Sequence, residues 1–121
     1  MALLGFQKWK ADKVESGECR QTIRARRKNR IKVGDRLIFA TGVRTKRYHA
    51  FGSAVCTETF EVRLAVTDNG KCAAWESDGL VDFEDIARRD GFADVTAMTT
   101  WFLTNHPVKS GWTLVLDVIR W

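Results

Sequence analysis

The sequence has few of the residues that interrupt, cross-link or anchor a chain. It contains one proline in 121 residues and no Gly/Ser-rich or Pro-rich stretch, so nothing in it resembles a linker between domains. No apolar run approaches the roughly 20 residues of a membrane span, and the amino-terminal apolar run is too short for the core of a signal peptide. We therefore expect one domain over residues 1–121, located in the cytoplasm and not bound to a membrane.

Cysteine and histidine are equally sparse. The three cysteines, Cys19, Cys56 and Cys72, are odd in number and widely spaced, without a C-x-x-C pair. This pattern indicates neither a disulfide framework nor a zinc finger, and we expect reduced thiols packed as small hydrophobes. Two distant histidines with scattered carboxylates define no metal site. A P-loop and a G-x-G-x-x-G fingerprint are also missing, so the sequence predicts no metal and no cofactor.

Positive charge is what the chain has in excess, and it is unevenly placed. Twenty Lys and Arg oppose 15 Asp and Glu, which gives a formal net charge of +5. A one-sided positive field attracts polyanions, and the guanidinium group matches the geometry of phosphate. We therefore expect RNA or a nucleotide as the ligand, with a merely solvated basic surface as the open alternative. The predicted phosphate contacts are Arg20, Arg24, Arg26, Arg27, Lys28, Arg30, Arg44, Lys46 and Arg47.

Hydrophobic periodicity and turn residues predict an α+β fold. Helices are expected over Phe6–Glu15, from a cap at Asp82 to Gly91, and from a cap at Asp94 to Pro107. Strands are expected at the end of Gly17–Arg24 and over Arg36–Thr41. A half-buried strand is expected between Phe51 and Val66, where apolar residues alternate from Phe60 onward, with a turn at Asp68-Asn69-Gly70. The last strand, Trp112–Trp121, should be central. The basic segments Ala25–Lys32 and Val43–His49 are expected to be loops. This order favours a small curled sheet or barrel flanked by helices.

Several segments, taken in order, resemble the ASCH domain family. They are Ser16–Arg24, which reads S-G-E-C-R-Q-T-I-R, then Val33–Leu37, then Asp90-Gly91-Phe92, then the closing strand. The resemblance spans nearly the whole chain, and its Q-T-I-R and V-G-D parts are moderately specific together. It implies a PUA-like β-barrel flanked by helices, a cleft lined by the T-I-R strand and the G-F region, and a role in binding RNA.

Some small bacterial members of that family are amidohydrolases that remove the acetyl group of 4-acetylcytidine with a lysine, a threonine and a glutamate. The resemblance places Thr22 on the threonine and Asp90 near the carboxylate, whereas Cys19 stands at the lysine position. A thiol differs from a desolvated lysine in proton affinity and geometry, and the neighbouring Arg20 cannot lose a proton at working pH. A second possibility is that Cys19 acts as a nucleophile, activated by nearby arginines and His49.

Two aromatic residues are candidates for stacking on a base, a contact that suits single-stranded RNA. Tyr48 lies among the cations of the second basic loop, and Trp75 lies beside turn residues, where core packing would explain it equally well. Trp101 and Trp112 fit apolar patterns and are expected in the core.

Thr22 and Arg24 are two residues apart on a strand, so both side chains should point to one side and could meet a base edge and a phosphate together. The resemblance, together with the basic segments, therefore predicts an ASCH-type module that binds RNA or a modified nucleotide or nucleoside. The alternatives are an amidohydrolase acting on an acetylated nucleoside through Thr22, Asp90 and Cys19, and a protein-interaction adaptor that binds an acidic partner through the same loops.

Overall fold

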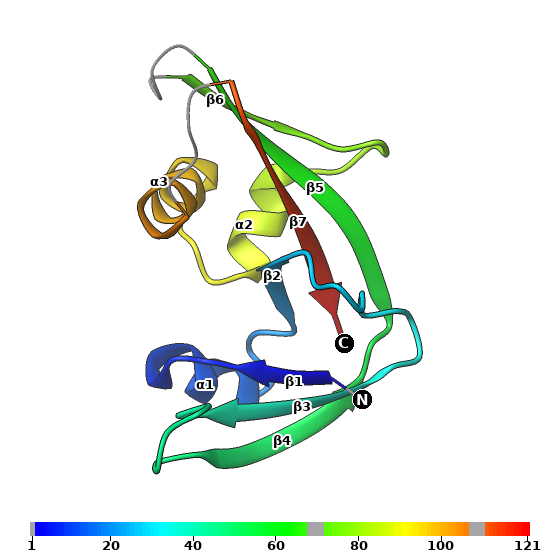
Figure 1. Cartoon of the computed structure of the whole chain (residues 1–121), viewed down its shortest axis with the longest axis vertical. Helices are drawn as coiled ribbons and strands as arrows, with labels where there is room; N and C mark the ends of the chain where they lie inside the picture. The colour runs from blue at the N-terminus through cyan, green and yellow to red at the C-terminus, as the bar shows by residue number, and fades with distance from the viewer. Residues whose placement is uncertain (1, 68–71, 107–110) are drawn as a thin grey trace. The chain divides into compact units, whose positions relative to one another are not determined.

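The computed structural model describes residues 2–67, 72–106 and 111–121 (Figure 1). Its elements in chain order are β1 (Ala2–Gly5), α1 (Lys8–Glu15), β2 (Gln21–Ala25), β3 (Arg36–Thr41), β4 (His49–Val55), β5 (Glu58–Thr67), β6 (Cys72–Glu76), α2 (Phe83–Arg89), α3 (Val95–Asn105) and β7 (Thr113–Arg120). None of the helices in these residues has the length and apolar character needed to cross a membrane.

The chain forms two compact units. Unit 1 consists of Met1–Thr22, Arg27–Thr59 and Ile119–Trp121, and unit 2 consists of Ile23–Arg26 and Phe60–Val118. Each unit draws on segments that are distant in the sequence, so neither unit could have been delimited by a linker. The expectation of a single domain stays a prediction.

The expected β-barrel is wrong, because the strands form two open sheets. One sheet has three strands in the order β1-β3-β4, and the other has four in the order β2-β7-β5-β6. β1 runs parallel to β3, while β3 and β4, and β5 and β6, are antiparallel pairs. A closed barrel has no edge strand, whereas in the described residues β1, β4, β2 and β6 each end a sheet. The α+β class holds, with open sheets in place of the barrel.

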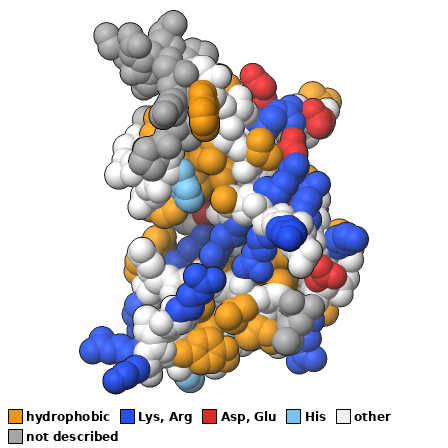
Figure 2. All heavy atoms as spheres, viewed as in Figure 1, with side chains coloured by type: hydrophobic (Ala, Val, Ile, Leu, Met, Phe, Trp, Pro, Cys, Tyr) orange, Lys and Arg blue, Asp and Glu red, His pale blue; other side chains and the backbone are white. Residues whose placement is uncertain are grey.

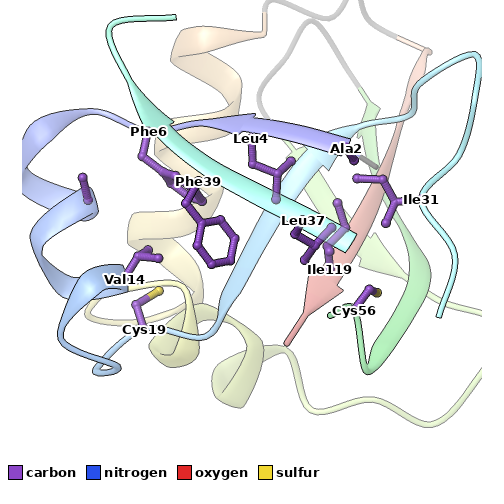
Figure 3. Close-up of a cluster of buried hydrophobic side chains, with 11 residues drawn as sticks. Ala2, Leu4, Phe6, Val14, Cys19, Ile31, Leu37, Phe39, Cys56 and Ile119 are labelled. Atoms are coloured by element: carbon purple, nitrogen blue, oxygen red, sulfur yellow. The ribbon is translucent and has the colours of Figure 1, made fainter. Parts of the chain in front are cut away.

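Unit 1 has its own hydrophobic core on one face of the three-stranded sheet. Side chains alternate along β1 and β3, so the cross-strand pairs Ala2–Leu37 and Leu4–Phe39 point the same way. Figure 3 shows Leu4, Leu37 and Phe39 directed toward a cluster that also contains Val14 of α1. This packing fixes β3 as the middle strand of the sheet.

Unit 2 packs two helices against its strands. Val62, Leu64 and Val66 alternate along β5 and are buried, as the pattern predicted, with Met98 and Phe102 of α3 packed in the same core. β7 lies between β2 and β5, which confirms the expected central position of the closing strand.

The predicted caps at Asp82 and Asp94 and the stops at Gly17 and Gly91 are confirmed, whereas the first helix begins at Lys8 and not at Phe6. The carboxylate of Asp82 accepts hydrogen bonds from the backbone N–H groups of the first turn of α2, and Asp94 does the same for α3. Gly17 and Gly91 follow α1 and α2 with φ of 81° and 96°, values that a residue without a side chain adopts at little cost. The turn expected at residues 68–70 and the stop at Pro107 lie outside the described residues.

The expected burial of two tryptophans is wrong. Trp101 is 39% exposed and Trp112 is 62% exposed. Trp101 falls at the margin of the apolar stripe of α3, whose buried residues are Met98 and Phe102. Trp112 precedes β7 and is therefore outside the strand alternation that suggested its burial.

Gly42, directly after β3, provides a test of how the β3–β4 connection is held. Its φ is 62°, and a Cβ atom at this position would lie 2.6 Å from the carbonyl oxygen of Arg47. We predict that Gly42→Ala lowers the free energy of unfolding by about 1–3 kcal/mol, because it combines a strained φ with a backbone clash. Urea denaturation followed by tryptophan fluorescence measures this change.

The matched control is Gly79→Ala. A Cβ at Gly79 meets nothing within 4 Å, and its φ lies outside the left-handed region, so the alanine should be tolerated. Equal unfolding free energies for the two variants would contradict the strain assigned to Gly42.

Candidate nucleic-acid interface

The two units differ sharply in charge. Unit 1 contains thirteen Lys and Arg against five Asp and Glu, a formal net charge of +8. Unit 2 contains seven against ten, a net charge of −3, and the two values add to the +5 of the chain. A polyanion is attracted by the local field more than by the total charge. Unit 1 is therefore the candidate interface.

The β3–β4 loop, residues 42–48, presents cations on an ordered turn. The carbonyl oxygen of Gly42 accepts hydrogen bonds from the backbone N–H of Thr45 at 3.0 Å and from its hydroxyl at 2.6 Å. The Thr45 hydroxyl oxygen also accepts from the backbone N–H of Arg47 at 3.1 Å, and the Thr45 carbonyl from Tyr48 at 3.2 Å. These bonds hold the loop backbone in a defined shape while its cations face outward.

The predicted phosphate contacts of this loop, Arg44, Lys46 and Arg47, are all exposed. Figure 2 shows Lys and Arg side chains projecting at the lower left, where the β3–β4 loop lies in Figure 1. Tyr48 at the end of the loop is 49% exposed. The loop thus presents cations and an accessible aromatic ring within a few residues of one another.

The first basic segment is divided between structural and exposed cations. Arg26 forms an ion pair with Glu61 and lies 3.7 Å from Asp117, both in unit 2. Arg27 belongs to unit 1, where its Nη2 donates to the carbonyl oxygen of Leu3 at 2.6 Å. Lys28 and Arg30 are exposed, as is Arg20 just before β2. Within the Arg26-Arg27-Lys28 cluster, Arg26 and Arg27 therefore make contacts inside the folded chain.

Glu61 is the centre of an ion-pair network in unit 2. Its Oε2 accepts from Nη1 of Arg63 at 2.5 Å, and Nη2 of Arg63 donates to Asp78 at 2.9 Å. Hydrogen bonds from Arg63 and Arg26 hold the pKa of the Glu61 carboxyl below its ordinary value. The network uses Arg26, which the sequence analysis had predicted as a phosphate contact.

The Q-T-I-R residues of β2, which the family resemblance placed at a ligand cleft, are buried or half-buried. Thr22 is 2% exposed, and Arg24, two residues along β2, is half-buried. Gln21 is also buried, and its side-chain oxygen accepts from Nε of Arg120 at 2.9 Å. Nη1 of Arg120 in turn donates to Glu58 at 2.7 Å. Sequence reasoning missed this chain of contacts, because Gln21 and Arg120 are 99 residues apart.

Cys19 and Asp90, the other two residues that the family resemblance suggested, are both buried. Cys19 is 3% exposed in the core of unit 1, and its thiol donates to the carbonyl oxygen of Gln21 at 3.3 Å. Asp90 belongs to unit 2, where it is the C-cap residue of α2. The thiol of Cys19 therefore packs as the small hydrophobe that the cysteine pattern predicted.

Trp75, the second stacking candidate, has partners within unit 2. Its ring packs 5.9 Å from that of Phe83 and 5.8 Å from that of Phe102, measured between centroids. The indole N–H donates to the hydroxyl of Thr99 at 2.8 Å. These contacts explain Trp75 as part of the packing of unit 2. Of the two candidates for stacking on a base, Tyr48 is therefore the accessible one.

Within the described ranges no group of three or more His, Cys, Asp or Glu side chains could hold a metal ion. No protein-family model matches the sequence, and comparison with curated proteins and with solved structures gives no match.

Glu61 gives a pH-dependent prediction. A carboxyl whose pKa is lowered by folding stabilises the folded state above its unfolded pKa of about 4.3, and this contribution is lost as the pH falls below that value. We expect the unfolding free energies of the native chain and Glu61→Gln to differ most at neutral pH and to converge in acid. Urea titrations at a series of pH values measure the difference. A gap that widens in acid would contradict the ion-pair assignment.

Thr22→Val tests whether the buried threonine acts on the fold or on a ligand. Valine keeps the shape of the side chain and removes the hydroxyl, which in a buried position typically contributes about 1 kcal/mol through its hydrogen bond. We expect the unfolding free energy to fall by that amount and the affinity for single-stranded RNA to stay unchanged. A large loss of affinity with unchanged stability would restore Thr22 as a ligand contact.

Proposed function

We propose that this protein is an ASCH-type binding module for RNA or a phosphate-bearing nucleotide, and that unit 1 makes the phosphate contacts. The observation that carries the proposal is the formal charge of +8 on unit 1, with exposed cations on the ordered β3–β4 loop. A cytoplasmic location, where RNA is accessible and thiols stay reduced, belongs to the same proposal.

The main contacts in this proposal are Arg44, Lys46 and Arg47, with Lys28 of the first basic segment as an addition. A loop whose turns are already hydrogen bonded loses little backbone freedom on binding, so more of the electrostatic attraction is retained as affinity. Tyr48 provides a surface on which an unpaired base can stack, a contact worth roughly 1–3 kcal/mol. A single strand offers phosphates and exposed bases together, and is therefore the preferred form of the ligand.

Binding is favoured over hydrolysis by the burial of the residues that a hydrolase would use. A general base or nucleophile has to reach the substrate, directly or through one water molecule. Thr22, Cys19 and Asp90 are all buried, whereas the cations of the β3–β4 loop are exposed. The proposal therefore rests on charge and stacking and contains no covalent step.

The test compares two double variants. Lys46→Ala/Arg47→Ala removes two loop cations, and Arg88→Ala/Arg89→Ala removes two exposed cations from α2 in unit 2. For a short fluorescent oligouridylate, the logarithm of affinity should fall linearly with the logarithm of salt concentration. The loop variant should reduce the magnitude of the slope by about 1.4, since each phosphate contact to a single strand contributes about 0.7. The α2 control should keep the native slope.

Equal slopes for the two variants, or no binding of the native protein at low salt, would overturn the proposal. A polyglutamate competitor separates RNA binding from the adaptor alternative. The adaptor reading requires polyglutamate to bind at least as tightly as the oligonucleotide of matched charge. The proposed function requires the oligonucleotide to bind more tightly, because only RNA offers bases to Tyr48.

A further inference from the structure

β4 ends the three-stranded sheet and has one unused edge. Among the described residues it pairs with β3 alone, in the order β1-β3-β4, and Figure 1 shows it as the outermost strand of that sheet. The strand has seven residues and is about 23 Å long at 3.3 Å per residue. A strand at a sheet edge presents a row of backbone N–H and C=O groups that can pair with another strand.

The sequence of β4 lacks the usual protection against such pairing. Edge strands are commonly blunted by charged side chains or by proline. His49–Val55 reads H-A-F-G-S-A-V and contains neither Lys, Arg, Asp, Glu nor Pro. A β-bulge places Phe51 of β4 as an extra residue opposite the step from Phe39 to Ala40, and from Gly52 to Val55 the pairing is regular. The regularly paired segment Gly52–Val55 is therefore the part of β4 whose outer edge is open for pairing.

The side chains of β4 indicate what an added strand would contain. Ser53 and Val55 are exposed and point to the same face of the sheet as their partners Ile38 and Arg36. Phe51 and Ala54 are partly buried against the core of unit 1. Alternate side chains of an added strand would cover these two groups, and β-branched residues fit both the pleated surface and the half-apolar surroundings.

Cations lie at both ends of β4. The β3–β4 loop with Arg44, Lys46 and Arg47 precedes the strand, and the exposed Arg36 lies opposite its last residue. A second copy of this chain would bring the same cations and another unit of charge +8, so charge disfavours self-pairing. Carboxylates at both ends of an incoming strand would be attracted instead.

We propose that β4 binds an extended acidic segment of a partner protein as an added strand, with β-branched residues at its centre and carboxylates at both ends. Main-chain hydrogen bonds along the open edge supply the affinity, and the flanking cations select the acidic segment. The inference does not require RNA binding, since the strand pairing depends on the backbone edge of β4, although the flanking cations are also the proposed phosphate contacts.

The probe is a capped synthetic peptide of about nine residues, long enough to span β4, that alternates valine with threonine and carries two carboxylates at each end. Binding is measured by fluorescence anisotropy with the full chain. Two further peptides are N-methylated at alternate positions, one at the odd and one at the even residues. Because only alternate N–H groups of a strand face a given neighbour, one peptide should lose more than about tenfold in affinity and the other should bind as before.

Ser53 gives a matched pair of protein variants. It is exposed, and both Ser53→Glu and Ser53→Lys leave the core untouched, which unchanged melting temperatures would verify. Ser53→Glu should weaken binding of the acidic peptide by up to about fivefold, because its charge lies diagonally across from a terminal carboxylate of the peptide, and Ser53→Lys should not weaken it.

Three results would overturn the inference. The first is no binding of the acidic peptide. The second is equal affinity of the two N-methylated peptides, which would show attraction by charge without strand pairing. The third is concentration-dependent dimerisation in sedimentation that Ser53→Lys abolishes, which would assign the β4 edge to a second copy of the chain.

Discussion

β3 is hydrogen bonded on both edges, to β1 and to β4, and the candidate surface of unit 1 depends on this double pairing. Its buried side chains, Leu37 and Phe39, fix which face of the sheet meets the core. A slip of one residue would exchange the two faces, so the register of β3 also determines which residues of β4 are exposed. The β3–β4 loop begins where β3 ends, and its cations are positioned by the same pairing.

A unit with a net charge of +8 has to be stable despite its own repulsion. Part of the cost is offset by cations that contact acceptors within unit 1. Arg27 donates to a backbone carbonyl, and Arg120 bridges Gln21 and Glu58. Most of the remaining cations are exposed to solvent, where water weakens their repulsion and salt screens charges that lie more than about 10 Å apart. The exposed position of these cations therefore reduces repulsion in the folded state and also leaves them accessible to a ligand.

Local signals predicted local structure well. Asp82 and Asp94 were recognised as helix caps because a cap is a property of a few adjacent residues. The barrel was wrong because sheet closure depends on pairings between distant strands. β1, β4 and β6 were not anticipated either, since β1 is short and the small residues of β4 and β6 give weak alternation. The site followed the same rule: the basic loops were found, but the pairing of Arg26 with Glu61, 35 residues away, has no signal in the sequence.

The proposed ligands of unit 1 draw on the same charges. RNA and an acidic strand would both be attracted by Arg44, Lys46 and Arg47, although only the strand uses the open edge of β4. Once one ligand has neutralised these cations, the field that attracts the other is weaker, so each ligand should lower the affinity for the other by the same factor. The coupling requires no change of shape. It arises from shared charge alone, and it would let an acidic partner segment regulate how strongly the module binds RNA.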